Sequence, residues 1–200
     1  MMNNKEEKIS VFAKNLRTQM EKTKIVKSIL KEKDRVPGFT LPNTEGKAIN
    51  FKEMLTGNRL VITFYGKSWR PYCNLELMAC QAVYEQLEKH NVKFVAISQH
   101  KPWPTSMRRG DINLTYETLI DVDNEVAKQF GLTFKVTGSE VRKFRESFCI
   151  DLVSLNSNDD VELSIPATYI VDRDGTILKS FFGFDNPDHP SPREILKYLH

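Results

Sequence analysis

Cysteine is scarce in this chain, which has only three among its 200 residues: Cys73, Cys80 and Cys149. An odd and small number of cysteines does not predict a disulfide scaffold. Residues 1–8 are polar and charged, and no apolar stretch of the kind found in a secretory signal follows them. We therefore expect reduced thiols in a reducing, cytoplasmic compartment.

Long apolar runs and an excess of one charge are lacking as well. No run approaches the roughly 18 apolar residues that cross a membrane, so we expect no membrane span. The formal net charge is +3, from 29 basic and 26 acidic residues, and this balance does not require a nucleic-acid partner. His100 has no second histidine or cysteine at metal-binding spacing. We expect no metal site and no cofactor.

Glycine and proline are absent from residues 5–33. Six apolar residues recur there at helical spacing: Ile9, Phe12, Leu16, Met20, Val26 and Leu30. We expect one long amphipathic helix that ends before Pro37, so that residues 1–34 precede a domain of residues 35–200. Two interpretations remain open. The apolar stripe packs on the domain, or it pairs with a second copy to form a homodimer or with another partner.

The rest of the chain alternates apolar strands with helical patterns. We expect a hairpin at 39–51 around a turn at 43–46, then a strand at 60–65, a helix at 71–90 and a strand at 92–98. Further on we expect a strand at 116–121, a helix at 123–131, a short helix at 141–148 in an irregular excursion to 163, strands at 165–171 and 176–183 joined by a turn at 172–175, and a helix at 192–199. A strand, helix and strand in this order indicate a right-handed βαβ unit. The pattern predicts an α/β fold with a mixed central sheet and helices on both faces.

One cysteine stands where a buried strand hands over to a helix. The apolar run breaks at Gly66 and the helix begins near Pro71, which puts Cys73 in its first turn. Unpaired N–H groups and the helix dipole stabilise a thiolate there, and Lys67 and Arg70 add positive charge. We expect Cys73 to be a reactive nucleophile, with a buried structural cysteine as the alternative.

Four phrases of the sequence, taken in order, resemble a known family. They are residues 36–42, the strand and turn up to Cys73, residues 121–132 and residues 165–175. They are similar to the thioredoxin-fold peroxiredoxins of the alkyl hydroperoxide reductase and thiol-specific antioxidant type, over about residues 35–185. The branch with the active-site phrase Trp-Cys-Pro-Tyr-Cys-Asn-Leu-Glu-Leu is most similar to residues 69–77.

The resemblance implies a thioredoxin-like fold and thiol-dependent reduction of hydrogen peroxide or alkyl hydroperoxides. Cys73 takes the position of the cysteine that becomes a sulfenic acid. An external thiol, such as thioredoxin or glutathione, would then regenerate it. Ser68 is a candidate N-cap of the helix, since its side-chain oxygen could accept an N–H of the first turn.

The chain departs from the family at three positions. Arg70 replaces the first cysteine of that branch, which removes the dithiol, and it stands where peroxiredoxins have threonine or serine. Gly66 stands where the family has proline. Pro166 stands where the family has arginine, and is instead similar to the cis-proline of thioredoxins, which implies a cis peptide facing Cys73. An ordinary trans proline at the start of a strand is the alternative. That Arg70 supplies the lost cationic contact is a hypothesis.

Four side chains are expected around the substrate, because ligands bind beyond the carboxyl ends of parallel strands. They are Trp69, Tyr72, His100 and Trp103. They follow the strands that end at Tyr65 and Ser98, so they could wall a pocket for an organic hydroperoxide. Ordinary loop packing is the alternative.

Two other cysteines are candidates to resolve the sulfenic acid. Cys80 is seven residues beyond Cys73, ~10 Å along a helix. A disulfide needs Cα atoms within ~7 Å, so this pair requires unwinding. Cys149 lies in the irregular excursion and is the more mobile candidate, although both cysteines could be small buried residues. We expect a one-cysteine cycle. The rival function is a non-catalytic binding or redox-sensing module that dimerises through its N-terminal helix.

Overall fold

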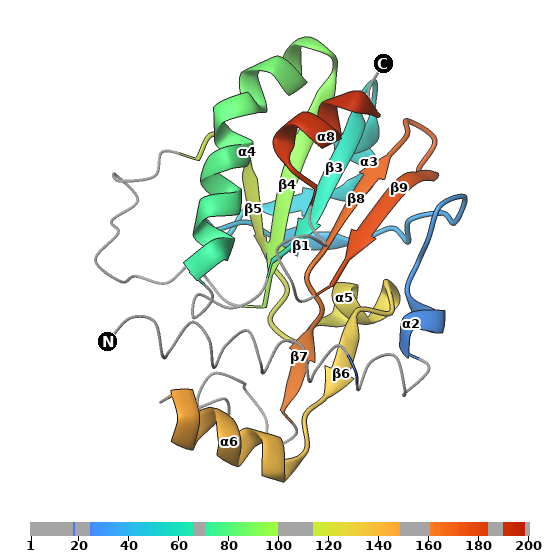
Figure 1. Cartoon of the computed structure of the whole chain (residues 1–200). Helices are drawn as coiled ribbons and strands as arrows, with labels where there is room; N and C mark the ends of the chain where they lie inside the picture. The colour runs from blue at the N-terminus through green and yellow to red at the C-terminus, as the bar shows by residue number, and fades with distance from the viewer. Residues whose placement is uncertain are drawn as a thin grey trace.

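The computed structural model describes residues 18, 25–65, 71–99, 114–148, 161–183 and 190–198, with residues 71–76, 140, 143–144 and 147–148 described by their backbone alone. Their centre is a five-stranded sheet in the order β5-β4-β3-β8-β9 (Figure 1). Its strands are β3 (Arg59–Phe64), β4 (Val92–Ser98), β5 (Glu117–Ile120), β8 (Ala167–Val171) and β9 (Ile177–Phe182). β3, β4 and β5 are parallel, whereas β8 is antiparallel to both β3 and β9. The predicted mixed sheet is confirmed.

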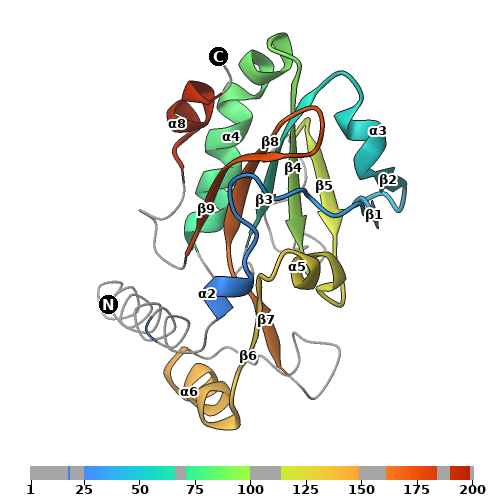
Figure 2. The ribbon, with the colours of Figure 1, turned by 90° about the vertical axis from the view of Figure 1, so that its right-hand side faces the viewer.

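Helices cover both faces of this sheet, as predicted (Figure 2). The helices α4 (Pro71–Lys89) and α8 (Pro192–Lys197) lie on one face. The helices α2 (Ile25–Ser28), α3 (Phe51–Leu55) and α5 (Glu125–Gln129) pack against the core on the other. The central strand β3, which lies between these two layers of helices, is an apolar run. Three of its residues have 0% exposure: Leu60, Val61 and Ile62. Burial on both faces explains why this run carries no polar alternation.

The expected hairpin is present as β1 (Thr40–Pro42) paired antiparallel with β2 (Ala48–Asn50). Its turn is built on Asn43, whose side-chain oxygen accepts the N–H groups of Glu45 and Lys47, each at 3.0 Å. Helix α3 follows at once and was not predicted. Asn50 caps it by accepting the N–H of Lys52 at 2.9 Å.

The excursion after α5 contains the short helix predicted near its start and two strands that the sequence did not predict. β6 (Thr133–Lys135) pairs antiparallel with β7 (Glu162–Ser164), and α6 (Gly138–Phe148) follows β6, below the sheet in Figure 1. Four buried side chains hold this ribbon: Phe134, Val136, Val161 and Leu163. They alternate along each strand, so one face of the two-stranded ribbon joins the main core.

The helix predicted over residues 5–33 ends earlier than expected, at Ser28. Leu30 donates its N–H to the carbonyl of Phe130 (3.1 Å), and Lys33 donates to the carbonyl of Ile177 (2.9 Å). These tertiary bonds replace the next helical ones. Ile29 is 2% exposed, so this end of the segment packs on the domain. Residues 5–24, apart from the helical Thr18, lie outside the described part.

The described helices differ in length and polarity. In the described part of the chain, none combines the length and the apolar content that a bilayer crossing requires.

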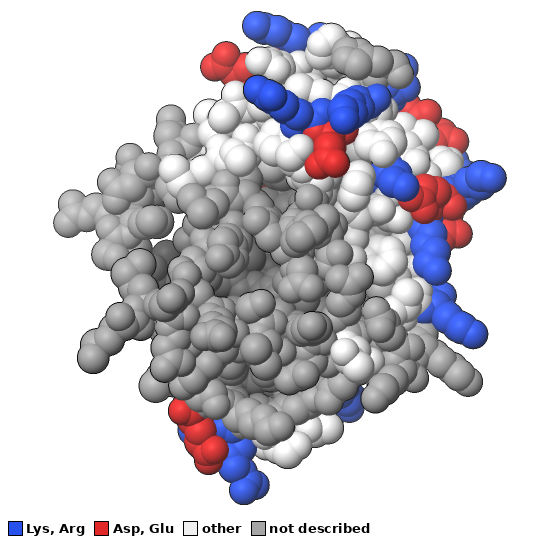
Figure 3. All heavy atoms as spheres, viewed as in Figure 1, with Lys and Arg blue, Asp and Glu red and all other residues white. Residues whose placement is uncertain are grey.

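Lys and Arg are interspersed with Asp and Glu over the described surface in Figure 3. One such pair is Lys179 with Glu32, whose charged atoms are 2.9 Å apart beside the edge strand β9.

Candidate active site

The parallel strands end at one edge of the sheet, and α4 begins there. β3 ends at Phe64, β4 at Ser98 and β5 at Ile120. The chain then needs only residues 65–70 to pass from β3 to Pro71, the first residue of α4. This arrangement is the strand-to-helix handover expected from the sequence. Ligand-binding groups of open α/β sheets gather at such an edge.

Cys73 is the third residue of α4, in its first turn. The first-turn N–H groups of a helix have no intrahelical acceptor, and the helix dipole is positive at this end. No acidic residue stands in the first turn of this described helix to oppose a thiolate. The backbone therefore places Cys73 where negative charge is stabilised.

Pro166 lies at the same edge, directly before the neighbouring strand β8. Ala167, the first residue of β8, is the register partner of Phe64. Pro166 is buried, and its carbonyl accepts the N–H of Gly183 at 3.1 Å. That Pro166 shapes the pocket around Cys73 stays a prediction.

The cis peptide predicted before Pro166 is wrong, and the trans alternative holds. Ile165 and Pro166 are both described, and no peptide bond between described residues is cis. Ile165 donates its N–H to the carbonyl of Leu132 (2.6 Å), which ties the link between β7 and β8 to the residue before β6. A trans proline suits the entry of a strand, because its missing N–H costs no ladder hydrogen bond there.

A pair of hydroxyl groups lies one residue inside this edge. Thr63 of β3 and Thr168 of β8 are register partners, and their side-chain oxygens are 2.5 Å apart. Along each strand, the residues before and after these threonines belong to the core on the side of α2, α3 and α5. Because side chains alternate along a strand, both threonines face the α4 side of the sheet. Sequence reasoning missed this pair, although a threonine within each of two apolar strands was a visible signal.

Cys80 belongs to the apolar seam by which α4 packs on the sheet. It is 9% exposed, between Leu77 and Tyr84. The hydroxyl of Tyr116 donates to the carbonyl of Leu77 at 3.0 Å. Burial, and then the nearby Cys80 and Tyr65, raise the pKa of Tyr116. Cys80 is thus part of a packed interface, and its separation from Cys73 is that of a continuous helix.

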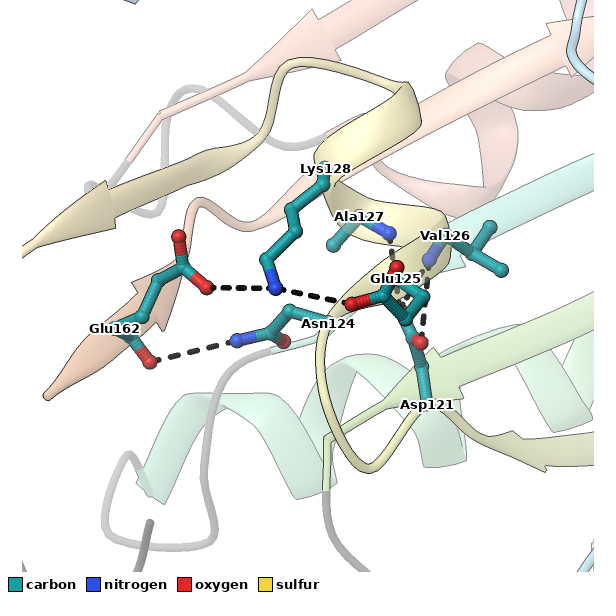
Figure 4. A network of polar contacts seen from close by, with 7 residues as sticks. All are labelled: Asp121, Asn124, Glu125, Val126, Ala127, Lys128 and Glu162. Carbon is teal, nitrogen blue, oxygen red and sulfur yellow. Dashed lines mark hydrogen bonds and ion pairs between the residues drawn. The ribbon is translucent and has the colours of Figure 1, made fainter. Parts of the chain in front are cut away.

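A polar network fixes the segment that follows β5 (Figure 4). Asp121 is 2% exposed and accepts the N–H groups of Val126 (3.1 Å) and Ala127 (2.9 Å) at the start of α5. Burial raises the pKa of this carboxyl, and the two N–H donors oppose that shift. The sequence phrase 121–132 therefore has a clear structural role.

The same network ties α5 to the ribbon β6–β7. Lys128 lies between two carboxylates, with Glu125 at 3.1 Å and Glu162 at 3.4 Å, as Figure 4 shows. Asn124, in the left-handed region at φ 56°, donates to the carbonyl of Glu162 at 3.4 Å. β7 is held in place just before it leads into β8.

Several predicted site residues lie outside the described part of the chain. They are Ser68, Trp69, Arg70, His100, Trp103 and Cys149. Tyr72 and Cys73 are described by their backbone, so their place on α4 is known. Among the described residues, no group of three or more His, Cys, Asp and Glu is arranged to hold a metal ion.

Comparison with known proteins points to one family. Residues 33–180 match the model of the AhpC/TSA family. Peroxiredoxin Bcp of Escherichia coli (strain K12) is 31% identical over 103 residues, which are 52% of this chain and 65% of that protein. A bcp-named peroxiredoxin relative in Helicobacter pylori (strain J99) is 26% identical over 153 residues, 76% of this chain and 88% of that protein. The match thus spans 65% of the length of the Escherichia coli relative.

Solved structures show the same fold at low identity. Peroxidoxin BcpB from Mycobacterium tuberculosis superposes with a TM-score of 0.66 at 19% identity, covering 85% of this chain and 96% of that one. Mycobacterium tuberculosis AhpC gives 0.60 at 16% identity, covering 86% and 92%. The family model covers more than half of the sequence, and the fold agrees with it. This chain belongs to the AhpC/TSA family.

Proposed function

We propose that this protein is a thiol peroxidase that reduces hydrogen peroxide or alkyl hydroperoxides through Cys73. The observation that carries the proposal is the place of Cys73 in the first turn of α4, directly after the central strand of an AhpC/TSA chain. The relatives named as peroxiredoxins support the same activity. Pro166, at the same edge, is proposed to shape the pocket together with Ser68 and the aromatic residues expected there.

The proposed reaction has two steps. The Cys73 thiolate attacks one peroxide oxygen, an S–O bond forms and the O–O bond breaks. The departing oxygen takes a proton and leaves as water or an alcohol. An external thiol then attacks the sulfenic sulfur, the S–O bond breaks and its oxygen leaves as water. A second thiol reduces the resulting mixed disulfide and returns Cys73.

Arg70 is proposed to hold Cys73 as the thiolate. A guanidinium stays protonated near neutral pH and favours a nearby negative charge. Because it replaces the first cysteine of the branch that the sequence resembles, an internal disulfide at that spacing is impossible. The reductant is therefore proposed to come from outside the chain, as thioredoxin or a glutathione-like thiol in a cytoplasmic compartment. Assembly as a homodimer through residues 5–33 remains a prediction.

A second candidate function is a binding or redox-sensing module without peroxidase turnover. Three departures from the family pattern favour it: the missing threonine and the lost first cysteine, both at Arg70, and the missing arginine at Pro166. Each removes a group that the resembled family places around its reactive cysteine. Such a module would use the same surface to hold a partner.

Stopped-flow measurement of peroxide consumption tests the choice. The purified chain, supplied with a dithiol reductant, should consume peroxide at a rate that falls to background in Cys73→Ser. Cys149→Ser is the matched control, because it removes a thiol that the one-cysteine cycle does not need. Slow consumption that is the same in all three proteins would favour the binding module.

A further inference from the structure

Three side chains join α4 to the segment before β5, away from the sheet edge where the candidate site lies. The hydroxyl of Tyr116 donates to the carbonyl of Leu77 at 3.0 Å. Gln81 makes two hydrogen bonds to Thr115: its side-chain N–H donates to the threonine hydroxyl (3.0 Å), and its side-chain oxygen accepts the threonine N–H (2.8 Å). We call these contacts of Tyr116, Gln81 and Thr115 the α4 clamp.

The sheet end of the clamp is rigid. Tyr116 is 5% exposed, and its ring lies against those of Phe94 (4.6 Å between centroids) and Tyr84 (5.6 Å). The next residue, Glu117, begins β5, which is hydrogen-bonded to β4. A residue held in this way moves little, so its hydroxyl fixes the helix that it contacts.

The clamp spans the part of α4 that would have to unwind for Cys80 to reach Cys73. The two cysteines are seven residues apart in one continuous helix, ~10 Å along its axis. A disulfide needs their Cα atoms within ~7 Å. Leu77 lies between the cysteines and Gln81 follows Cys80 directly. Unwinding this stretch would therefore pull Leu77 from Tyr116, and moving Cys80 would strain the Gln81–Thr115 pair.

We propose that the α4 clamp keeps Cys80 from resolving an oxidised Cys73, so that the sulfenic acid is left for an external thiol. The proposal rests on the proposed function for the role of Cys73. In the reaction that is prevented, the Cys80 sulfur attacks the sulfenic sulfur and an S–S bond forms. The S–O bond breaks, and the oxygen leaves as water with the thiol proton. Tyr116 and Gln81 are positioning residues.

The test uses the full chain with Cys149→Ser, which leaves Cys73 and Cys80 as its two thiols. Diamide oxidises two thiols to a disulfide while it is reduced to the hydrazine, and it needs no peroxidase activity. Adding Gln81→Ala and Tyr116→Phe should speed formation of the Cys73–Cys80 bridge at least tenfold, as followed by mass analysis of non-reduced digests. Circular dichroism checks that each protein is folded.

Two further variants separate the clamp from general loosening. Tyr84→Phe removes a hydroxyl from the same aromatic group, but that hydroxyl bonds to Glu88 of α4 itself, so bridging should stay slow. Gln81→Glu keeps an acceptor for the Thr115 N–H and should restore most of the protection that Gln81→Ala loses.

Equal bridging rates in the clamp variant and its background would overturn the proposal. If the double variant does not fold, Gln81→Ala alone is used with hydrogen exchange: amides 77–81 should exchange faster than in the parent, and unchanged exchange would refute the clamp. Failure of the proposed function looks different. It would appear as peroxide consumption that does not depend on Cys73, and the diamide result would stand regardless.

Discussion

The ring of Tyr169 lies edge-on against that of Phe130, with centroids 5.1 Å apart, and its hydroxyl is buried without a hydrogen-bond partner among the described residues. Phe64 completes the aromatic group, 4.8 Å from Phe130 and 6.3 Å from Tyr169. Tyr169 is 0% exposed. A buried hydroxyl that bonds nothing loses its hydration without compensation.

Tyr169→Phe should therefore stabilise the protein, because it deletes the hydroxyl and keeps the ring packing. We expect the free energy of unfolding to rise by about 1 kcal/mol, at the low end of the cost of an unsatisfied buried polar group. Urea denaturation followed by fluorescence measures it. Tyr116→Phe is the matched comparison, since its hydroxyl is bonded to Leu77 and its loss should destabilise. A loss of stability in Tyr169→Phe would mean that the hydroxyl has a partner.

Gly131 ends α5 at a point where the N-terminal segment crosses it. Its φ is +71°, and a Cβ atom there would stand 2.1 Å from the carbonyl oxygen of Ser28. Gly131→Ala should therefore lower the free energy of unfolding in two ways. The backbone strain contributes about 1–2 kcal/mol, and the new Cβ atom must also displace residues 28–30. Chemical denaturation gives the total.

Gly57→Ala isolates the strain, because Gly57 has φ +75° and open space around its Cβ position. The difference between the two alanine variants reports the contact with Ser28. If both variants lose the same stability, residues 25–30 do not depend on packing against α5.

The carboxyl of Asp121 gives a pH-dependent prediction. Burial raises its pKa in the folded state, so the unfolded chain releases this proton at lower pH. The free energy of unfolding therefore falls as pH rises from the unfolded value toward the folded one. Asp121→Asn resembles the protonated acid and cannot ionise, so its free energy of unfolding should not show this fall with rising pH.

The loss of stability caused by Asp121→Asn should accordingly be larger at about pH 4 than at about pH 7. Urea denaturation of both proteins at the two values measures it. Glu85→Gln is the control for general acid effects, since Glu85 is exposed on α4 and is not among the groups that shift the pKa of Asp121. A cost that grows with pH would show that the N–H donors of Val126 and Ala127 outweigh burial.

The sequence predicts those parts of the fold in which local pattern and burial agree. The apolar run of β3, the helix α4 and the turn before β9 each carry their own signal, and all three were found. Helix α3 is five residues long, too short for a periodic pattern to show. β6 and β7 have three residues each and are far apart in sequence, so their pairing has no turn signal.

Long-range hydrogen bonds account for the early end of the predicted N-terminal helix. Lys31, Glu32 and Lys33 favour a helix locally, yet the chain leaves the helix because Leu30 and Lys33 bond to distant carbonyls. For the candidate site, the sequence predicted Cys73 and Pro166, and both lie at the sheet edge where β3 ends, while their roles stay predictions. The contact of Tyr116 with α4, away from this edge, was not predicted, because a hydroxyl that reaches across 39 residues leaves no trace in local spacing.

Arg70 is the residue whose replacement best tests the proposed chemistry. If its charge favours the Cys73 thiolate, Arg70→Met should lower the rate of alkylation by iodoacetamide near neutral pH by roughly tenfold, which corresponds to about one unit in the thiol pKa. The ultraviolet absorbance of the thiolate, followed against pH, should move to higher pH. Lys67→Met is the control for a second nearby charge.

Arg70→Thr then distinguishes charge from hydroxyl. It restores the residue type that the resembled family has three positions before its reactive cysteine, and it removes the guanidinium. If the charge dominates, this variant should alkylate as slowly as Arg70→Met and consume peroxide no faster. If the hydroxyl contact dominates, peroxide consumption should rise above that of the parent even though alkylation slows, because alkylation reports thiolate formation alone while peroxide reduction also depends on contacts to the departing oxygen. Parent-like rates in both assays for both variants would show that Arg70 acts on neither step.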